Sequence, residues 1–341
     1  MKAFRITAPG TFDFVEIPVP VIGPDEVLVR TVFVGFCGSD LSTYRGRNPL
    51  VSLPRIPGHE ISGIIEALGS AVPPDLKPGM PVTVHPYTAC GSCPACLRQR
   101  PNACENNQTM GVQREGAMTG YIAVPWRKIV SVPGLPPLSL ALVEPIAVGC
   151  HAVRRGEVRP GELVLVLGCG AIGLGAIAAV AARGATAVAV DLDPEKLETA
   201  RRAGAAHTIN SAAEDVAVRL QALKPGGPDV VIEAIGIPST YLMSVDLVAY
   251  TGRVVYIGYS SEPVAYQTKK FVQKELDIRG SRNSMPEDFA DAVSILKSGT
   301  FPTDAMVSRT VPFNEAGDVL EYWNGQPGKV MRIVVDMGLS V

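Results

Sequence analysis

Short runs of β-branched and other apolar residues, separated by Gly and Pro, dominate about the first 145 residues of the chain. Two of them are EVLVRTVFVGF (residues 26–36) and PGMPVTVHPY (78–87). Apolar runs bounded at short intervals by turn-forming residues are typical of strands. The pattern predicts a barrel-like or sandwich-like sheet in this part of the chain.

After Pro145 the pattern changes to alternating strand and helix signals. One helical segment is PEKLETARRAG, where Pro194 suits the first turn of a helix and Gly204 suits its end. Six apolar segments are expected to be strands: residues 163–168, 187–191, 207–210, 229–236, 253–259 and 276–281. Strands joined by helical crossovers predict an α/β fold with a parallel, doubly wound sheet.

The tail of the chain changes character again. From about Met285 a helix (286–299) is followed by short β-like segments that end in KVMRIVVDM (329–337). This tail is more similar to the first region than to the middle one.

Length and composition indicate how many domains to expect and where in the cell the protein is located. The 341 residues are 47% hydrophobic and 19% charged, with a net charge of −2. A soluble protein of at least two domains is expected, with neither nucleic acid nor a membrane as partner. Residues 163–182 carry no charge, but they include four glycines that a spanning helix would tolerate poorly, so we interpret them as strand, turn and helix. The start, MKAFRITAPG, lacks the features of a secretion signal, which favours a cytoplasmic location.

A dinucleotide site is predicted where the first strand of the middle region ends. Gly168, Gly170 and Gly173 form G-x-G-x-x-G between a strand and a helix, and Asp191 ends the next strand. The first glycine permits the turn, the second lets the backbone approach a pyrophosphate, and the third brings helix and strand close.

The helix that follows, beginning near Ala171 and Ile172, offers free N–H groups to the phosphates. Asp191 can accept hydrogen bonds from a ribose 2′-hydroxyl and would repel a 2′-phosphate, which favours NAD over NADP. NADP remains an alternative, because a nearby Arg can change that preference. A glycine-rich turn that binds no ligand is the other alternative.

Four of the seven cysteines lie close together, at Cys90, Cys93, Cys96 and Cys104. Four thiolates satisfy tetrahedral Zn²⁺ completely and leave no position for a substrate. The spacing therefore predicts a structural zinc site that stabilises a lobe at residues 86–106. An iron–sulfur cluster and disulfides are the alternatives, and disulfides fit poorly with a reducing compartment.

Catalysis then needs another site. Cys37, His59 and Glu60 supply a thiol, an imidazole and a carboxylate, which are the ligand types of an open catalytic zinc site. A buried core thiol and a hydrogen-bonded core histidine are the alternative explanations.

Taken together, these motifs resemble the zinc-dependent medium-chain alcohol dehydrogenases, especially their sorbitol and polyol dehydrogenase branch. The resemblance runs over nearly the whole chain and includes, in order, CGSD (37–40), GHEISGIIEALG (58–69), the four-cysteine lobe, LVEPIAVGCHAVRR (142–155), GCGAIG (168–173) with Asp191, and GSRNSMPEDF (280–289). It implies a GroES-like β-barrel catalytic domain (1–145) and a six-stranded NAD-binding Rossmann domain (146–284). Residues 285–341 would return to the catalytic domain, with a cleft between the two.

The resemblance also implies roles for individual residues. Cys37 and His59 would bind the catalytic zinc, the second zinc of the chain. Glu60 and, in the polyol branch, Glu144 would lie near that metal and bind it directly or through water. Asp40 would orient His59.

Cys150 and His151 lie inside the helix predicted after Pro145. Cys150 is a tempting substitute ligand, but we expect a structural role for it. His151 is expected to pack or to contact the cofactor.

The implied reaction is oxidation of a secondary alcohol to a ketone, with hydride transfer to NAD⁺. Zinc lowers the pKa of bound water by roughly nine units, to about 7, which is a factor of roughly 10⁹ in acidity. One acid–base side chain contributes roughly 10²–10⁴-fold, so the metal is the expected main source of activation. Ser39 would take the hydroxyl proton. Many relatives carry a His three residues later, where this chain has Ser42.

A polyol, sugar or sugar acid is the expected substrate, because many polar residues are expected around the pocket: Tyr44, Arg45, Arg47, Asn48, Arg282 and Asn283. Arg282 is similar to the family's substrate-contacting arginine and is also assigned to the cofactor site, whereas Arg45 and Arg47 are expected to be solvated. A threonine-type amino alcohol dehydrogenase and a non-catalytic nucleotide-binding zinc protein are the alternatives. A homodimer or homotetramer is expected from the resemblance.

Overall fold

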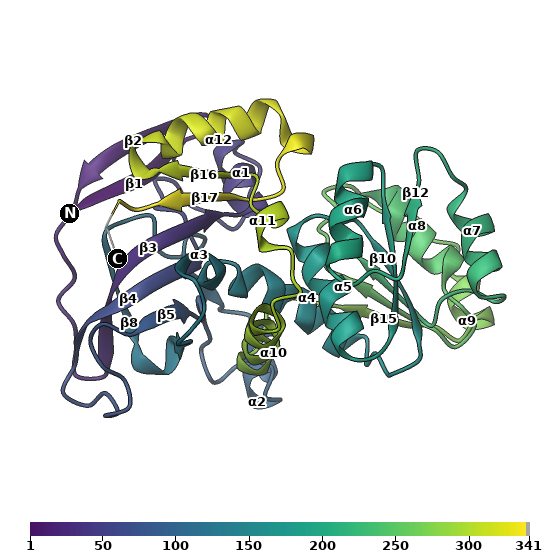
Figure 1. Cartoon of the computed structure of the whole chain (residues 1–341), viewed down its shortest axis with the longest axis horizontal. Coiled ribbons are helices and arrows are strands. Elements are labelled where there is room, and N and C mark those ends of the chain that lie inside the picture. The colour runs from purple at the N-terminus through teal and green to yellow at the C-terminus, as the bar shows by residue number, and fades with distance from the viewer. Residues whose placement is uncertain (339–341) are drawn as a thin grey trace. The chain divides into compact units, whose positions relative to one another are not determined.

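The computed structural model describes residues 1–338. The chain divides into two compact units (Figure 1): residues 1–144 together with the chain from Thr303 onward, and residues 145–302.

The first unit is built on a seven-stranded sheet. Six of its strands follow the order β16-β17-β3-β4-β5-β9, and β8 also pairs with β3. The long strand β3 pairs antiparallel with β4, β8 and β17. The elements of this unit are β1 (Lys2–Ala8), β2 (Thr11–Glu16), β3 (Glu26–Phe36), α1 (Gly38–Tyr44), β4 (Glu60–Leu68), β5 (Pro81–Val84), β6 (Tyr87–Thr88), α2 (Pro94–Leu97), η1 (Pro101–Ala103), β7 (Gln108–Thr109), β8 (Tyr121–Pro125), η2 (Trp126–Lys128), β9 (Ile129–Ser131), α3 (Pro137–Leu140), α11 (Thr303–Met306), β16 (Arg309–Pro312), η3 (Phe313–Glu315), α12 (Ala316–Gly325), η4 (Pro327–Lys329) and β17 (Ile333–Asp336).

The tail joins the first unit through this sheet. Strand β17 lies beside β3, and its Ile333 and Val335 are buried in the same core as Phe4 and Phe36. The tail and the first region share a pattern of short β-like segments because their strands belong to one sheet.

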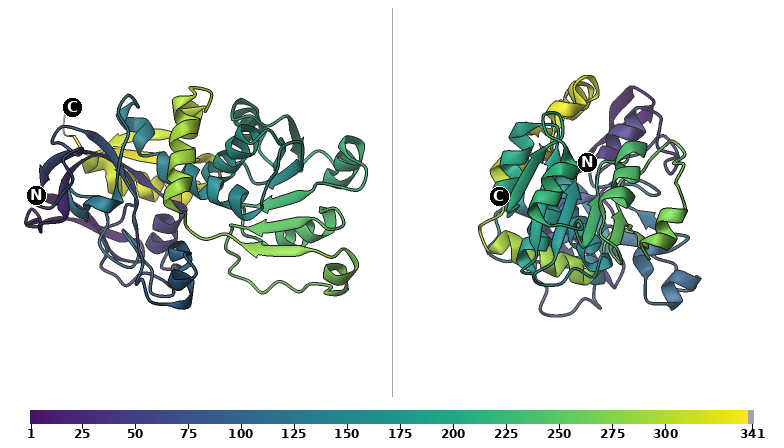
Figure 2. Two further views of the ribbon diagram at one scale, coloured as in Figure 1. Left: turned by 90° about the horizontal axis from the view of Figure 1, so that it is seen from below. Right: turned by 90° about the vertical axis from the view of Figure 1, so that its right-hand side faces the viewer.

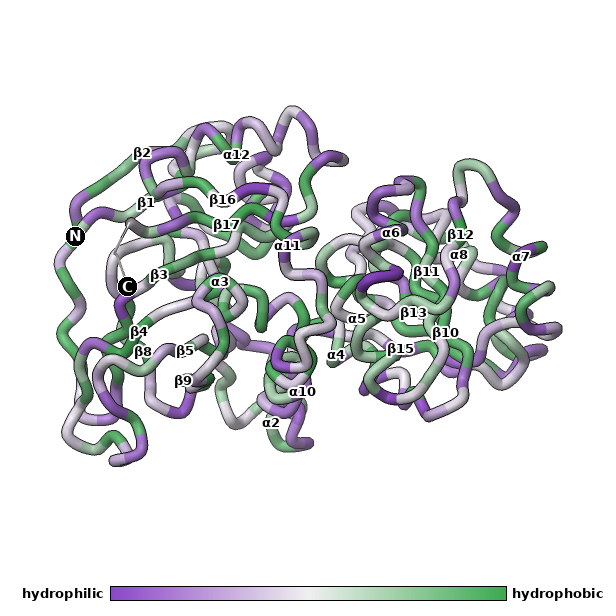
Figure 3. Tube along the Cα trace, in the orientation of Figure 1, coloured by the Kyte–Doolittle hydropathy of each residue, from purple (hydrophilic) through white to green (hydrophobic). Residues whose placement is uncertain are grey.

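The second unit is a six-stranded parallel sheet in the order β12-β11-β10-β13-β14-β15. Figure 2 shows helices on both of its faces. All of β10 is buried, and Figure 3 shows the hydrophobic character of the strands around it. The elements are α4 (Val143–Arg155, which begins just before this unit), β10 (Leu163–Leu167), α5 (Ala171–Ala182), β11 (Thr186–Asp191), α6 (Pro194–Arg202), β12 (His207–Asn210), α7 (Val216–Leu223), β13 (Val230–Glu233), α8 (Pro238–Leu247), β14 (Arg253–Tyr256), α9 (Lys269–Gln273), β15 (Asp277–Gly280) and α10 (Pro286–Lys297).

This strand order is that of a doubly wound Rossmann sheet, so the predicted fold class is confirmed. Two strands end three residues before their predicted ends. β13 ends at Glu233 rather than at residue 236, because the chain turns at Gly236 with a φ of +87°, and β14 ends at Tyr256 rather than at residue 259.

The return to the first unit lies at Thr303, not at residue 285. Helix α10 belongs to the second unit because it packs on α5, with Phe289 and Ala292 buried. Asp288 of α10 also accepts a hydrogen bond from Arg154 of α4 (2.7 Å). The sequence pattern marked where the helix begins but not which sheet it covers.

Within residues 1–338, no helix is both long enough and apolar enough to cross a bilayer. The uncharged stretch 163–182 is strand β10, a turn and helix α5, as predicted.

Candidate metal and nucleotide sites

Three side chains that the sequence linked only by ligand type are brought together in the first unit. Sγ of Cys37, a ring nitrogen of His59 and a carboxylate oxygen of Glu60 all lie within 4.8 Å of one another. Cys37 precedes α1, Glu60 is the first residue of β4, and His59 lies directly before it. Gly58, just before them, has a φ of +105°, and a Cβ there would meet Cγ1 of Val34 at 2.6 Å. Only glycine lets the chain enter β4 so close to β3.

Two of the three residues are buried, and they carry polar atoms without hydrogen-bond partners in the described part of the chain. His59 is 5% exposed and Glu60 is fully buried. Within the described chain, Nδ1 of His59 and Oε2 of Glu60 have no hydrogen-bond partner. Burial lowers the pKa of His59, but the neighbouring Cys37, Asp40 and Glu144 raise it well above its usual value. Orphaned polar atoms in a buried, negative group of S, N and O donors fit a divalent cation such as zinc.

Glu144 is not one of these three residues. It is 4% exposed, and its Oε1 accepts a hydrogen bond from the hydroxyl of Tyr87. Burial raises the pKa of Glu144 to about 6, against the opposing charge of His59. The Glu144 carboxylate is thus close enough to His59 for the charge of His59 to affect its pKa, and the hydrogen bond from Tyr87 fixes its position.

Asp40 does not make the expected hydrogen bond to His59. Its Oδ2 accepts the N–H of Cys37 (2.8 Å) and so caps α1. Burial raises the pKa of Asp40 to about 6, opposed by the charge of His59. The hydroxyl of Ser39 is buried and has no hydrogen-bond partner among residues 1–338.

Cys150 and His151 are both buried in α4. Burial raises the pKa of the Cys150 thiol. Nδ1 of His151 lies 2.7 Å from Oδ2 of Asp288 in α10. Both placements fit the packing roles predicted for these residues.

The four-cysteine lobe lies between β6 and β7. Its sulfur atoms are 3.5–4.0 Å apart along four of their six separations: Cys90–Cys96, Cys93–Cys96, Cys93–Cys104 and Cys90–Cys104. A tetrahedral zinc with Zn–S bonds of about 2.3 Å separates its sulfurs by about 3.8 Å. Hydrogen bonds from backbone N–H groups of Ser92 and Cys93 lower the pKa of Cys90 to about 5, which favours the thiolate. The lobe fits one structural zinc, and its thiols are free rather than paired as disulfides.

The glycines of the second unit have the local geometry that a dinucleotide site requires. Gly168 has a φ of +96°, and a Cβ on Gly173 would meet the carbonyl oxygen of Gly168 at 1.9 Å. A Cβ on Gly170 would meet open space, where a pyrophosphate could approach. Helix α5 begins at Ala171, followed by Ile172, so its free N–H groups face this space.

Asp191 ends β11 beside this turn. Its Oδ2 accepts the N–H of Cys169 (2.8 Å), and its Oδ1 accepts the N–H of Leu192 (2.8 Å). Arg282 follows β15, and both residues therefore lie at the carboxyl edge of the parallel sheet, where ligands bind in doubly wound folds.

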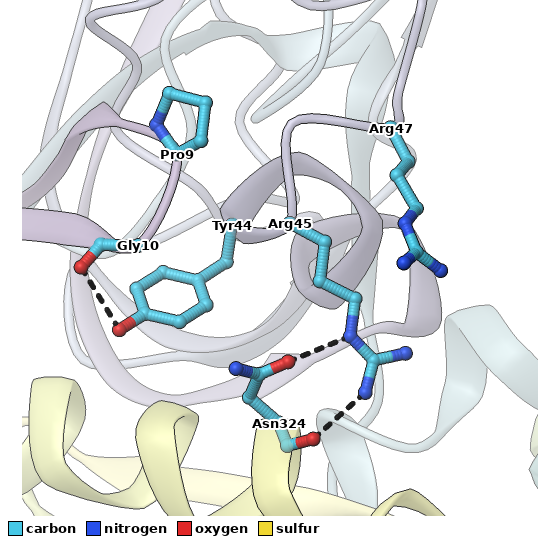
Figure 4. A pocket seen from close by; sticks show the side chains of 6 residues that line it. All are labelled: Pro9, Gly10, Tyr44, Arg45, Arg47 and Asn324. Atoms are coloured by element: carbon cyan, nitrogen blue, oxygen red, sulfur yellow. Dashed lines mark hydrogen bonds between the residues drawn. The ribbon is translucent and has the colours of Figure 1, made fainter.

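Three of the polar residues expected around a substrate, Tyr44, Arg45 and Arg47, lie instead at the far end of α1 or just past it. A pocket of about 480 Å³ is lined by Pro9, Gly10, Tyr44, Arg45, Arg47 and Asn324 (Figure 4). The Tyr44 hydroxyl donates to the carbonyl of Gly10 (3.2 Å), and Nε of Arg45 donates to Asn324 (2.7 Å). At about 1.5 Å per residue, Tyr44 lies about 7.5 Å along the helix from Ser39. In this structure Tyr44 and Arg45 attach α1 to neighbouring segments.

Comparison with known proteins assigns the two units to the same two domain types that the sequence motifs predicted. Residues 23–134 match the alcohol dehydrogenase GroES-like domain, and residues 171–298 match the zinc-binding dehydrogenase domain. L-galactonate-5-dehydrogenase of Escherichia coli K12 is 38% identical over 90% of this chain and 89% of its own length. The chain belongs to the zinc-dependent medium-chain alcohol dehydrogenases.

Its relatives place it in the polyol branch of that family. Sorbitol dehydrogenase of Bacillus subtilis is 34% identical over 89% of this chain and 88% of its own length. An alcohol dehydrogenase of E. coli CFT073, complexed with NADH, has a TM-score of 0.90 and 28% identity, and covers 99% of each chain. A zinc-binding dehydrogenase of Sinorhizobium meliloti 1021, bound to NADP, has a TM-score of 0.89 and 32% identity over 98% of each chain. Solved relatives thus carry each of the two nicotinamide cofactors.

Two residues of this dehydrogenase's metal site were not identified from the sequence. Nη1 of Arg332, which is 3% exposed, lies 2.5 Å from Oε1 of Glu60 and 3.0 Å from the carbonyl oxygen of Phe36. Tyr87 holds Glu144. The available signal for Arg332 was a lone cation within the apolar run VMRIVV (330–335), and Tyr87 gave no signal beyond its place next to the lobe.

Proposed function

We propose that this protein oxidises a secondary alcohol of a polyol, sugar or sugar acid to a ketone and transfers the hydride to NAD⁺. The observation that carries the proposal is the group of Cys37, His59 and Glu60, of which the latter two are buried. The Ser39 hydroxyl, two residues after Cys37, has no hydrogen-bond partner among the residues that the structure describes. The substrate class is supported by the L-galactonate and sorbitol dehydrogenases among the relatives.

Zinc held by Cys37 and His59, with Glu60 or Glu144 as a further ligand, would act as a Lewis acid on the substrate oxygen. A second zinc would be held by the four cysteines of the lobe. These assignments follow the donor types and their separations.

The protein's own groups supply the other steps. Ser39 Oγ would accept the proton of the substrate hydroxyl and pass its own proton to water, and a bound nicotinamide would supply the acceptor for the hydride. Burial of the cluster excludes water, and Arg332 balances the charge of Glu60. The turn at Gly168, Gly170 and Gly173 binds the pyrophosphate.

NAD is proposed over NADP because the Asp191 carboxylate is fixed by backbone N–H groups beside the turn. It would accept hydrogen bonds from ribose hydroxyls and repel a 2′-phosphate. A cytoplasmic location and a homodimer or homotetramer stay predictions.

The test is a panel of hexitols, pentitols, aldonates, threonine and simple alcohols, each with NAD⁺ and with NADP⁺, followed by absorbance of the reduced cofactor. Metal analysis of the same preparation should give two zinc ions per chain. Turnover of threonine or simple alcohols alone would refute the substrate class. One metal without turnover would support the non-catalytic alternative.

A further inference from the structure

We propose that Tyr87 is a positioning residue for the proposed catalytic metal site, and that the four-cysteine lobe sets the position of Tyr87. The proposal rests on the proposed function, because Glu144 is expected to act at the metal. It assigns the lobe a second role besides local stability: it supports a hydrogen bond at the catalytic centre.

The first observation is the hydrogen bond by which Tyr87 fixes the position of Glu144. Both side chains are 4% exposed, and the phenol donates to Oε1 of the carboxylate. The ring of His85 packs edge-on against Tyr87 with centroids 5.0 Å apart, and Nζ of Lys128 donates to the Tyr87 carbonyl. Ring and backbone are therefore both fixed. Loss of the phenol would leave a buried carboxylate oxygen without this donor, and Glu144 would reorient.

The second step links Tyr87 to the lobe. Tyr87 lies in β6 and pairs with Thr109 of β7, and these two short strands flank the lobe. Nδ2 of Asn107 donates to Oγ1 of Thr109 (2.8 Å), and the N–H of Asn107 donates to the carbonyl of Cys104 (3.3 Å). Hydrogen bonds thus connect a lobe cysteine to β7, the strand that pairs with β6 and its Tyr87.

The connection to the lobe matters because β6 and β7 are too short to stay paired without support. β6 and β7 have two residues each, and an isolated two-stranded ribbon is marginally stable even when it is longer. The closed lobe fixes the ends of both strands. When the lobe opens, the register of Tyr87 against Thr109 is no longer fixed, and the phenol can leave Glu144.

The experiment uses the full chain with Co²⁺ at the catalytic site and Zn²⁺ in the lobe, because Co²⁺ reports its ligands through visible absorption. We expect Tyr87→Phe to change that spectrum and to weaken Co²⁺ binding in a chelator competition by about 10–100-fold, the usual effect of removing a group that orients a ligand. Thr109→Val, which removes the contact to Asn107, should change the spectrum in the same direction. Adding it to Tyr87→Phe should cause no further change. Tyr121→Phe, in β8 of the same unit, is the matched control and should leave the spectrum unchanged.

A wild-type spectrum and affinity in Tyr87→Phe would overturn the positioning role. A wild-type spectrum in Thr109→Val, with the Tyr87 variant altered, would overturn the link to the lobe. If Thr109→Val does not fold, Asn107→Ala interrupts the same connection. Zinc content and NADH production of the wild-type protein test the proposed function separately, because neither depends on the variants.

Discussion

At the scale of single residues, the ion pair of Glu60 and Arg332 is the most buried charged contact of the metal site. The side chains are 0% and 3% exposed. Removing one partner of a buried pair leaves an unpaired charge and costs about 3–5 kcal/mol, whereas replacing both partners can cost little. Each of the two charges therefore depends on the other for its neutralisation even when no metal is bound.

We predict that Arg332→Met lowers the free energy of unfolding of the metal-free protein by about 3–5 kcal/mol. The double variant Glu60→Gln/Arg332→Met should recover most of that loss, because it leaves no carboxylate to be neutralised. Urea unfolding followed by tryptophan fluorescence measures both, since Trp126 and Trp323 both lie in the first unit. A double variant as unstable as the single one would show that packing, not charge, is responsible.

The same pair marks the limit of what the sequence could predict. Cys37 and His59 lie in short motifs whose ligand types can be read directly, and the spacing of the lobe cysteines specifies one tetrahedral ion. Arg332 meets Glu60 only because β17, near the end of the chain, lies beside β3 and β3 lies beside β4. Long-range strand pairing of this kind leaves no local pattern in one sequence.

At the scale of elements, the turn before α5 separates two roles that glycine can have. Gly173 is needed for packing, because a Cβ there would overlap the carbonyl oxygen of Gly168. Gly170 faces open space with a φ of −70°, which alanine adopts without strain. This difference between the glycines was predictable, because G-x-G-x-x-G assigns the approach of the pyrophosphate to its second glycine and the close packing of helix on strand to its third.

We predict that Gly170→Ala leaves stability within about 0.5 kcal/mol of wild type and weakens NAD binding. Gly173→Ala should reduce both stability and binding, because α5 can no longer seat against β10. Thermal unfolding and titration calorimetry with NAD separate the two effects. Equal loss of stability in both variants would contradict this assignment of roles.

The helices α4 and α10 are joined by a network of charged side chains around the buried Asp288. Asp288 of α10 is fully buried and accepts hydrogen bonds from Arg154 (2.7 Å) and from the N–H of Met285 (2.8 Å), with His151 2.7 Å away. Asp291 extends the network, accepting a hydrogen bond from Arg154 and lying 3.8 Å from Arg183. Burial alone would raise the pKa of Asp288, but the hydrogen bonds from His151 and Arg154 lower it below its usual value.

A carboxyl whose pKa is lower in the folded state stabilises that state fully above its unfolded pKa of about 3.9, and this contribution is lost as the pH falls through the folded value. We predict that Asp288→Asn destabilises α10 by about 3 kcal/mol at pH 7, and that the difference from wild type shrinks below about pH 4. Hydrogen exchange of residues 286–297, compared between variant and wild type at the same pH, measures this. A difference that stays constant down to pH 3 would show that the charge of Asp288 is not its source.

At the scale of the whole molecule, each unit has its own hydrophobic core and its own ligand. Phe4, Phe36 and Ile333 belong to the core of the first unit, and Leu165, Val188 and Val231 to that of the second. The two candidate metal sites lie in the first unit and the dinucleotide turn in the second. The sequence predicted this division of function but assigned α10 to the first unit. The apolar face of an amphipathic helix does not indicate which of two sheets it covers.

Separate cores with separate ligands lead to a prediction about stability. A ligand stabilises the folded unit that binds it, by about 2.7 kcal/mol at 100 times its Kd. NAD should therefore raise the hydrogen-exchange protection of residues 163–191 and leave the tryptophan unfolding transition unchanged, because both tryptophans belong to the first unit. A zinc chelator should do the reverse: it should lower the tryptophan transition and leave the protection of residues 163–191 unchanged. His59→Ala serves as the control, since it should remove part of the chelator effect and none of the NAD effect. If NAD and chelator both shift one common transition, the two units unfold as one, and the stability of each site then depends on the ligand of the other.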